Sequence, residues 1–265
     1  MNLGDSAVAA AASAAGLSGP SIVVRPLGLT GDSAFQGVLE PLRELPAASM
    51  IKVPLAAALT ALWAAGERRP DDRVTIAAEN MTPNDAESPL VPGFRASLEE
   101  LGRLMLVRSD NVATNTLIDV IGRERATEFA SGWGLLATAL RRKLSGALPL
   151  IDDPAASGRN AHPAGDAAHL FELIARNQIP GSAWLREMLA AQEWNAKLNR
   201  GLQPGDRFAH KTGDTDEVSH DGGILELASG RRYVIVVYTT LSSSRENDAR
   251  FGDFMCRLRP FLDRG

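Results

Sequence analysis

A serine and a lysine three positions apart begin a segment whose side chains could form and break a bond. Ser49 and Lys52 precede an apolar run with almost no charge before Glu67, which is typical of a buried helix. Helical spacing puts the hydroxyl and the amine on one face, one turn apart. The hydroxyl is a candidate nucleophile, and the amine is a candidate base if burial or a nearby cation keeps it neutral. Alone the pair is a weak signal, because Ser-x-x-Lys arises about once by chance in a chain this long.

Two further short motifs follow in order. Ser109-Asp110-Asn111 begins 60 positions after Ser49, and Lys211-Thr212-Gly213 begins 102 positions later still. Taken singly, Ser109 reads as a helix cap, Asn111 as a turn residue and Lys211 as a surface residue of a strand. Their order, and the elements that each of them occupies, are what give the set its weight.

The elements that must position these motifs can be read from periodicity and turn residues. Strands are predicted at 21–27, 35–40, 207–212, 220–228 and 231–240, and a Ser229-Gly230 turn joins the last two into a hairpin. Helices are predicted at 5–15, from Ser49 onward with a bend at Pro54, from a Ser97 cap, at 112–122, 124–133, 163–174, 182–189 and 247–262. Residues 135–162 read as a long surface loop.

Strands at both ends and helices between them predict an α/β (α+β) fold. We expect a five-stranded antiparallel sheet built from both termini and flanked by helices, with an all-helical lobe inserted. The α/β lobe would comprise 1–45 and 200–265, and the helical lobe 46–199, with the cleft between them. The chain has 265 residues and a net charge of −4, which argues against a general nucleic-acid binder.

The three motifs together resemble the class A β-lactamases and the wider group of serine penicillin-recognising enzymes. The resemblance runs from about Ser21 to the end of the chain and implies a β-lactamase/DD-peptidase-like fold. It implies catalytic roles for Ser49 as the acylated nucleophile, Lys52 as the base, Ser109 as a proton relay and Lys211 as the second cation. Mutual repulsion between the two amines would lower the pKa of both.

The same resemblance implies a substrate-binding set. Asn111 would hold the amide side chain of the substrate, and Thr212 with Lys211 would bind its carboxylate. Gly213 would let the substrate lie along the strand edge, and the backbone N–H groups of Ser49 and Asp214 would form the oxyanion hole. The Asp214 side chain would oppose an anionic substrate unless it turns away.

The chain departs from the resemblance at the step that removes the acyl group. Class A enzymes resemble one another in a Glu on the loop after the second motif, but no acid occurs between Ser131 and Ile151. Four residues are alternative candidates for deacylation or for the entrance of the cleft: Asp152, Asp153, His220 and Glu87. Two adjacent acids before a proline are more often a solvated turn, and strand alternation points His210 away from Lys211.

Three functions remain open from the sequence. The first is a serine hydrolase of class A β-lactamase type that opens a β-lactam through an acyl-enzyme on Ser49. The second is a DD-peptidase, amidase or esterase on the same scaffold with a non-β-lactam substrate. The third is a binder that is acylated and does not hydrolyse its adduct. We expect a small-molecule β-lactam, amide or ester partner, a monomer, and neither nucleic acid nor membrane as a partner.

No cofactor and no metal site are indicated, because the four histidines lack ligand spacing. The N-terminal segment has no basic residue before Arg25, so we read it as a surface helix and expect a cytoplasmic chain, or a periplasmic or secreted one if a leader has been removed. The single cysteine, Cys256, is expected in the core.

Overall fold

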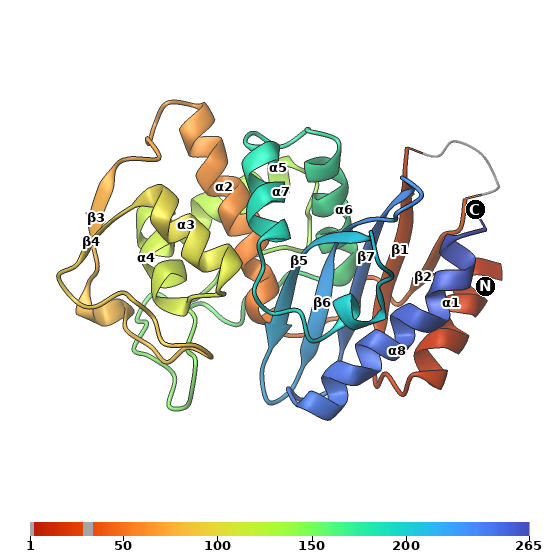
Figure 1. Ribbon diagram of the computed structural model, residues 1–265. Coiled ribbons are helices and arrows are strands. Elements are labelled where there is room, and N and C mark those ends of the chain that lie inside the picture. Colours follow the sequence, from red (N-terminus) through yellow and green to blue (C-terminus); the bar gives the residue numbers. More distant parts are fainter. Residues whose placement is uncertain (1–2, 29–33, 265) are drawn as a thin grey trace.

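The computed structural model describes residues 3–28 and 34–264, with a sheet toward one end and helices toward the other (Figure 1). The helices are α1 (Leu3–Ala14), α2 (Lys52–Ala64), α3 (Leu98–Val107), α4 (Asn111–Ile121), α5 (Arg123–Gly132), α6 (Ala164–Ala175), α7 (Ser182–Ala190) and α8 (Arg245–Leu262), with 3-10 turns η1 (Ala48–Ile51), η2 (Ala78–Asn80) and η3 (Leu198–Gly201). The strands are β1 (Ser21–Leu27), β2 (Gly37–Leu39), β3 (Arg73–Thr75), β4 (Arg95–Ser97), β5 (Arg207–Asp214), β6 (Ser219–Glu226) and β7 (Arg232–Thr239).

The main sheet has the order β2-β1-β7-β6-β5, and all of its neighbouring strands are antiparallel. Strand β1 pairs with β7 at the centre, in a register that places Val23 opposite Val236. The two ends of the chain therefore build one sheet, which confirms the predicted fold class. Strand β5, which carries the third motif, is left at the edge.

Strand β7 shows why its sequence is apolar throughout. Val234, Val236 and Tyr238 pack into a core shared with the helical region, whereas Tyr233, Ile235 and Val237 pack into a second core beneath α1 and α8. Because successive side chains of a strand point to opposite faces, a strand covered on both sides must be apolar at every position. Figure 1 shows α1 and α8 side by side over one face of the sheet and α6 over the other.

Helix α2 is the centre of the helical region. Its residues from Lys52 to Leu62 are all buried, so it is apolar on every side rather than amphipathic. Around it, α3 begins with the predicted Ser97 cap, which exchanges hydrogen bonds with Glu100 as a capping box. Helix α4 begins at the second motif, where the Asp110 carboxylate accepts a hydrogen bond from the Ala113 N–H.

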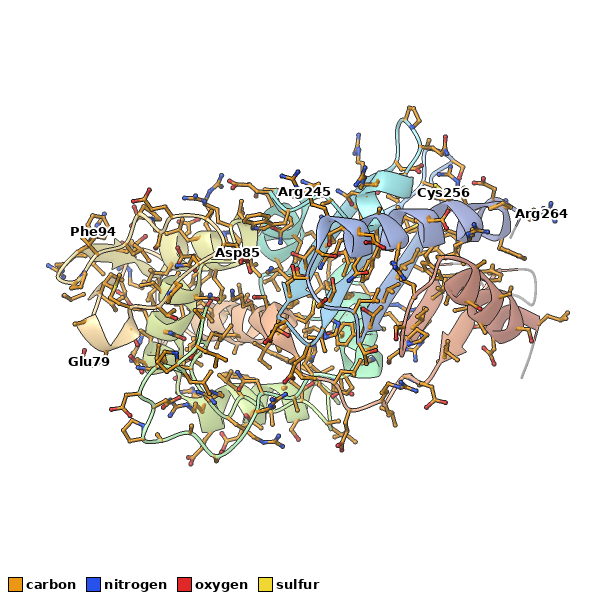
Figure 2. The ribbon with its side chains drawn as sticks, turned by 90° about the horizontal axis from the view of Figure 1, so that it is seen from below. Glu79, Asp85, Phe94, Arg245, Cys256 and Arg264 are labelled. Atoms are coloured by element: carbon orange, nitrogen blue, oxygen red, sulfur yellow. The ribbon has the colours of Figure 1, made fainter. Side chains whose placement is uncertain are left out.

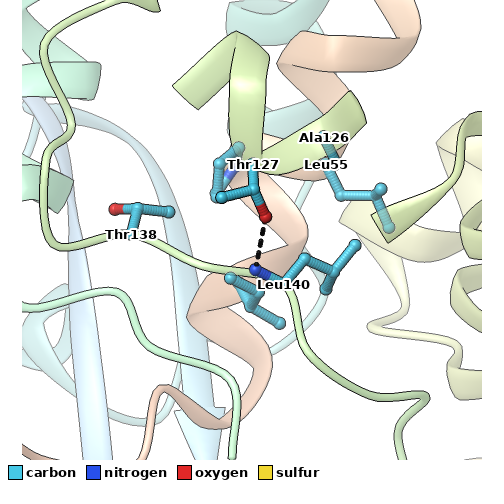
Figure 3. A pocket seen from close by; sticks show the side chains of 7 residues that line it. Leu55, Ala126, Thr127, Thr138 and Leu140 are labelled. Atoms are coloured by element: carbon cyan, nitrogen blue, oxygen red, sulfur yellow. Dashed lines mark hydrogen bonds between the residues drawn. The ribbon is translucent and has the colours of Figure 1, made fainter. Parts of the chain in front are cut away.

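The long loop between α5 and α6 is held at its base. Ala139 and Ala161 exchange backbone hydrogen bonds of 2.8 and 2.9 Å, and the Thr127 hydroxyl accepts one of 3.1 Å from the Leu140 N–H (Figure 3). A void of about 10 Å³ lies beside this contact, against Leu55 of α2. It has room for about one water molecule, so it is not a substrate site.

Two predictions were wrong in detail. The bend at Pro54 assumed a helix that starts at Ser49, but α2 starts at Lys52, so Pro54 lies in a first turn whose N–H groups have no helical partner in any case. Cys256 is exposed on α8 rather than buried (Figure 2). The turn predicted between β1 and β2 lies largely outside the described residues. Among the described residues, no helix has both the length and the apolarity to cross a membrane.

Candidate active site

The three motifs meet at one cleft of about 250 Å³ between the helical region and the edge of the sheet. Ser49 comes from η1, Ser109 from the turn between α3 and α4, and Thr212 and Asp214 from β5. Six further residues complete the lining: Asp85, Trp194, Ala196, Lys197, Ser243 and Asp248.

Ser49 is presented by a tight approach between η1 and β5. Ala48, directly before it, has φ of +46°, a left-handed conformation that costs a non-glycine residue free energy and is concentrated at functional sites. A Cβ on Gly213 would lie 3.2 Å from both the Ala48 Cβ and the Met50 nitrogen. The glycine therefore lets the strand reach the Ser49 turn. The Ser49 hydroxyl lines the cleft and bonds to none of the described residues.

Lys52 is fully buried and directed at the second motif. Its Nζ lies 2.6 Å from the Ser109 carbonyl oxygen, 3.0 Å from the Ser109 Oγ and 2.8 Å from the Asn111 Oδ1. Burial, and then the charge of Lys211, lower the pKa of Lys52 well below its ordinary value. A neutral amine would donate to two of these acceptors and accept the Ser109 hydroxyl proton through its lone pair.

Lys211 reaches the same hydroxyl from the sheet. Its Nζ is fully buried and lies 2.9 Å from the Ser109 Oγ and 2.9 Å from the Thr212 carbonyl oxygen. Burial is the main cause that lowers the pKa of Lys211, to about 7, and the charge of Lys197 adds to it. The Ser109 hydroxyl therefore contacts two amines, and the pKa of each lies far below that of an exposed lysine.

Ser109 is held for this contact by an unusual backbone. Its φ is +59°, and Asp110 next to it caps α4. Such strain is sustained only where the surroundings fix it. The arrangement can carry a proton between the cleft and either lysine, because a hydroxyl both donates and accepts.

Asn111 is already engaged within the protein. Its Oδ1 accepts from Lys52, its Nδ2 donates to the Pro83 carbonyl oxygen at 3.1 Å, and its backbone N–H bonds to the Asn84 Oδ1 at 2.5 Å. The second hydrogen of its Nδ2 is the one left for another partner. Binding of a substrate amide by Asn111 stays a prediction.

Comparison with known proteins shows which family the chain resembles. The beta-lactamase enzyme family matches the chain over residues 6–254. The chain belongs to this family. Among curated proteins, no match was found.

Solved structures of beta-lactamases resemble this family member over nearly its whole length. A beta-lactamase from Sphaerobacter thermophilus is 26% identical with a TM-score of 0.81, and covers 97% of both chains. PBP-A, in a variant solved as an acyl-enzyme complex with penicillin G, is 23% identical with a TM-score of 0.84, and covers 99% of this chain and 96% of its own. A beta-lactamase from Chitinophaga pinensis is 21% identical with a TM-score of 0.81, and covers 99% of each chain.

Within this beta-lactamase-like fold, none of the four candidates for deacylation or the entrance lines the cleft. Asp152 and Glu87 are exposed, and Asp85 takes the place at the cleft that was considered for Glu87. Asp153 is bound to the Arg123 guanidinium at 2.5 Å and to the Lys143 N–H at 2.7 Å, which is a structural contact within the loop.

The His220 ring also faces away from the cleft. It is buried, stacks on Tyr238 with centroids 4.0 Å apart, and lies 2.8 Å from the Pro46 carbonyl oxygen. Burial lowers the pKa of His220 to about 4. His220 contacts Lys197 through its backbone, because the His220 carbonyl oxygen accepts a hydrogen bond from the Lys197 Nζ.

One loop residue held next to α4 is apolar. The Asn115 side chain, one turn after Asn111 on α4, holds the Leu144 N–H at 2.7 Å and the Leu144 carbonyl oxygen at 2.9 Å. Leu144 is half-buried against the core. A carboxylate at this point would be near Lys52, but the sequence supplies none.

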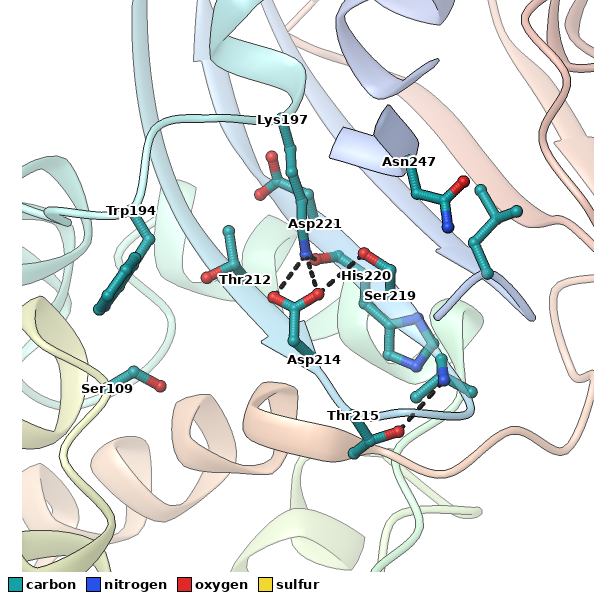
Figure 4. A network of polar contacts seen from close by, with 12 residues as sticks. Ser109, Trp194, Lys197, Thr212, Asp214, Thr215, Ser219, His220, Asp221 and Asn247 are labelled. Atoms are coloured by element: carbon teal, nitrogen blue, oxygen red, sulfur yellow. Dashed lines mark hydrogen bonds and ion pairs between the residues drawn. The ribbon is translucent and has the colours of Figure 1, made fainter. Parts of the chain in front are cut away.

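The sequence did not predict the ion pair that lines the cleft opposite Ser109. Lys197 and Asp214 form an ion pair there, and Asp248 lies in the same lining (Figure 4). Lys197 stands in a short segment between α7 and η3 that carries no motif. The signal available in the sequence was a lysine close after Trp194, in the short connection between α7 and η3. The described residues contain no group of three or more His, Cys, Asp or Glu that could hold a metal ion.

Proposed function

We propose that this protein opens the cyclic amide of a β-lactam through an acyl-enzyme on Ser49. The observation that carries the proposal is the convergence of Lys52 and Lys211 on the Ser109 hydroxyl, at a cleft that the unbonded Ser49 hydroxyl also lines. Two buried amines with lowered pKa values supply a base at neutral pH, which a serine nucleophile requires.

The proposed acylation gives the motif residues the roles that the resemblance implies for them. The Ser49 Oγ attacks the carbonyl carbon, an O–C bond forms, and the Ser49 proton passes to the neutral amine of Lys52. The developing oxyanion would be held by the backbone N–H groups of Ser49 and Asp214. The C–N bond then breaks as the nitrogen takes the Ser109 proton, and a lysine bonded to the Ser109 Oγ replaces that proton.

Release of the acyl group would be the slow step. A water molecule needs a base to attack the ester, and the candidate acids lie outside the cleft lining, while the loop residue bonded to Asn115 of α4 is the apolar Leu144. We therefore expect the acyl-enzyme to accumulate. A binder that stays acylated is the limiting case of this behaviour.

A DD-peptidase, amidase or esterase with a non-β-lactam substrate is the second candidate function. The ion pair between Lys197 and Asp214 favours its amidase or esterase form, because it places a carboxylate where the carboxylate of a β-lactam or of a peptide C-terminus would bind. Small esters and D-amino-acid amides would then be cleaved faster than any β-lactam.

Intact-mass measurement with benzylpenicillin over time tests the proposal. The wild type should gain the mass of one penicillin and keep it for hours, and Ser49→Ala should gain nothing. Ser131→Ala, an exposed serine on α5, is the matched control and should behave as the wild type. A wild type that neither gains the adduct nor turns over a chromogenic cephalosporin would exclude the β-lactam function. Ester cleavage dependent on Ser49 would then establish the second candidate.

A further inference from the structure

The Lys197 ammonium has no hydrogen left for a ligand. It donates to the two Asp214 carboxylate oxygens at 2.7 and 2.6 Å and to the His220 carbonyl oxygen at 3.0 Å (Figure 4). An ammonium group has three donors, so these contacts use all of them. Lys197 is only 3% exposed, although it is the one lysine in the cleft lining.

Both partners of this ion pair are fixed in place. The Ser219 hydroxyl donates to the Asp214 Oδ1 at 2.9 Å, and the Lys197 Nζ lies 5.4 Å from the centroid of the Phe251 ring. The backbone next to Lys197 is held by a hydrogen bond of 3.0 Å from the Leu198 N–H to the buried Asp221. The pair is therefore preorganised, and an arriving ligand would have to break it.

The remaining charges in the lining are negative. Asp85 and Asp248 join Asp214 there, against the single lysine that Asp214 already neutralises. The Asp248 Oδ1 is buried and bonds to none of the described residues. A carboxylate entering the cleft would therefore meet groups of like charge, of which Asp85 is partly offset by its attraction to Lys52 and Lys211.

Little else at this end could bind a carboxylate. Lys211 has two of its hydrogens on the Ser109 Oγ and the Thr212 carbonyl oxygen. Its third hydrogen, the Thr212 side chain and the hydroxyl of Ser243, which also lines the cleft, are left, and none of them adds a second full positive charge as a free Lys197 ammonium would.

We infer that Asp214 is a specificity-determining residue that disfavours substrates with a carboxylate, by holding Lys197. The preferred acyl donor is then an amide or ester that is uncharged at the end facing Asp214. This inference rests on the proposed function, because it concerns which acyl donor the Ser49 hydroxyl attacks.

Benzylpenicillin and its methyl ester provide the test. The two compounds share the ring and the acyl side chain and differ only in the charge of one group. The rate at which intact protein gains either adduct is measured, and the ratio of the ester rate to the acid rate is the readout. We expect this ratio to exceed one in the wild type and to fall at least about tenfold in Asp214→Asn, because the freed Lys197 can then bind the carboxylate of the acid.

Two variants separate charge pairing from other causes. Asp216→Asn changes the net charge equally at an exposed position of the β5–β6 turn and should leave the ratio as in the wild type. The double variant Asp214→Asn with Lys197→Met removes both charges. It should show little of the fall in the ester-to-acid ratio that is expected for Asp214→Asn alone. If the ratio falls as far in the double variant as in Asp214→Asn, the Lys197 ammonium is not the group that Asp214 keeps from the substrate carboxylate, and the inference fails.

The outcomes distinguish the two proposals. If neither compound acylates the wild type, the proposed β-lactam function fails. If both acylate it and the acid is preferred in the wild type, Asp214 does not exclude carboxylates, and the inference alone fails. The wild-type ratio needs no variant, so it decides the point even if Asp214→Asn does not fold.

Discussion

The Lys211 Nζ lies 2.9 Å from the Ser109 Oγ, so an amine from the edge of the sheet is bonded to a hydroxyl from the helical region. The same hydroxyl is 3.0 Å from the Lys52 Nζ. Neither amine is exposed, and each lowers the proton affinity of the site for the other. This shared contact makes both stability and chemistry depend on pH.

The free energy of unfolding should rise as the pH is raised from 7 to about 9. The pKa of Lys211 is about 7 in the folded protein and near 10.5 when the chain is unfolded, so between these values the unfolded state binds more protons. The stabilisation is complete above the unfolded value and is lost as the pH falls toward 7. Urea unfolding at several pH values measures the slope, and Lys211→Met should flatten it.

Lys52 adds to the same slope, because its pKa is lowered too. Tyr238 does not interfere in this range, since burial raises its pKa well above the ordinary value. A wild-type free energy of unfolding that stays constant or falls between pH 7 and 9 would mean that these lysines are not buried as described.

Gly213→Ala should slow acylation by about tenfold, because the added methyl needs η1 to shift by a few tenths of an ångström, and a full displacement of about 1 Å would cost about 100-fold. The added methyl would press on Ala48 and on the Met50 nitrogen at 3.2 Å and force η1 and β5 apart. It should also lower the free energy of unfolding by about 1–3 kcal/mol.

Gly132→Ala is the matched control for this variant. Gly132 ends α5, and a Cβ there would have no atom within 4 Å. Its acylation rate should equal that of the wild type. Equal rates for the two alanine variants would show that the close approach of β5 does not position Ser49.

Leu144→Glu should shorten the lifetime of the acyl-enzyme by at least about tenfold, because a carboxylate on this loop could act as a general base. The Asn115 side chain fixes the Leu144 backbone one helical turn from Asn111, which bonds to Lys52. Decay of the penicillin adduct is followed by intact mass. The new carboxylate also raises the pKa of Lys52, so acylation should slow.

Leu148→Glu introduces the same charge on the same loop at a residue that is 77% exposed. Its adduct should decay as slowly as that of the wild type. An unchanged adduct lifetime in Leu144→Glu would place position 144 out of reach of the ester.

The neighbouring acids of the loop should respond differently to neutralisation. Asp153→Asn breaks a contact with Arg123 in which the aspartate side chain is 4% exposed, and should lower the free energy of unfolding by about 3 kcal/mol. Asp152→Asn, at an exposed side chain, should change it by less than about 0.5 kcal/mol.

Thermal unfolding and adduct decay together measure this pair of variants. If Asp152→Asn prolongs the acyl-enzyme several-fold, Asp152 reaches the cleft in solution and is the deacylating base after all. If the two variants lose equal stability, the ion pair of Asp153 does not anchor the loop.

What the sequence predicted well is what local spacing encodes. The three-residue interval between Ser49 and Lys52, the Ser97 cap and the alternation that turns His210 away each depend on a few neighbouring positions. The five-stranded sheet followed from apolar runs at both ends of the chain.

What the sequence did not predict depends on contacts between distant segments. Lys197 meets Asp214 only because η3 packs against α8 and its Leu198 N–H bonds to Asp221 of β6, and no motif marks either residue as half of a pair. Gly213 was expected to make room for a substrate, but its missing side chain also makes room for Ala48 and Met50. Cys256 was placed in the core by its apolar neighbours, although α8 turns it outward.

The pairing of β1 with β7 has a consequence for synthesis on the ribosome. Val23 pairs with Val236, more than two hundred residues later, so the centre of the sheet cannot assemble until all of the intervening chain has been translated. The nucleophile and its first lysine are made early, whereas the second lysine arrives with the last quarter of the chain. A nascent chain is thereby inert, and its exposed β1 edge is a segment that chaperones would need to shield.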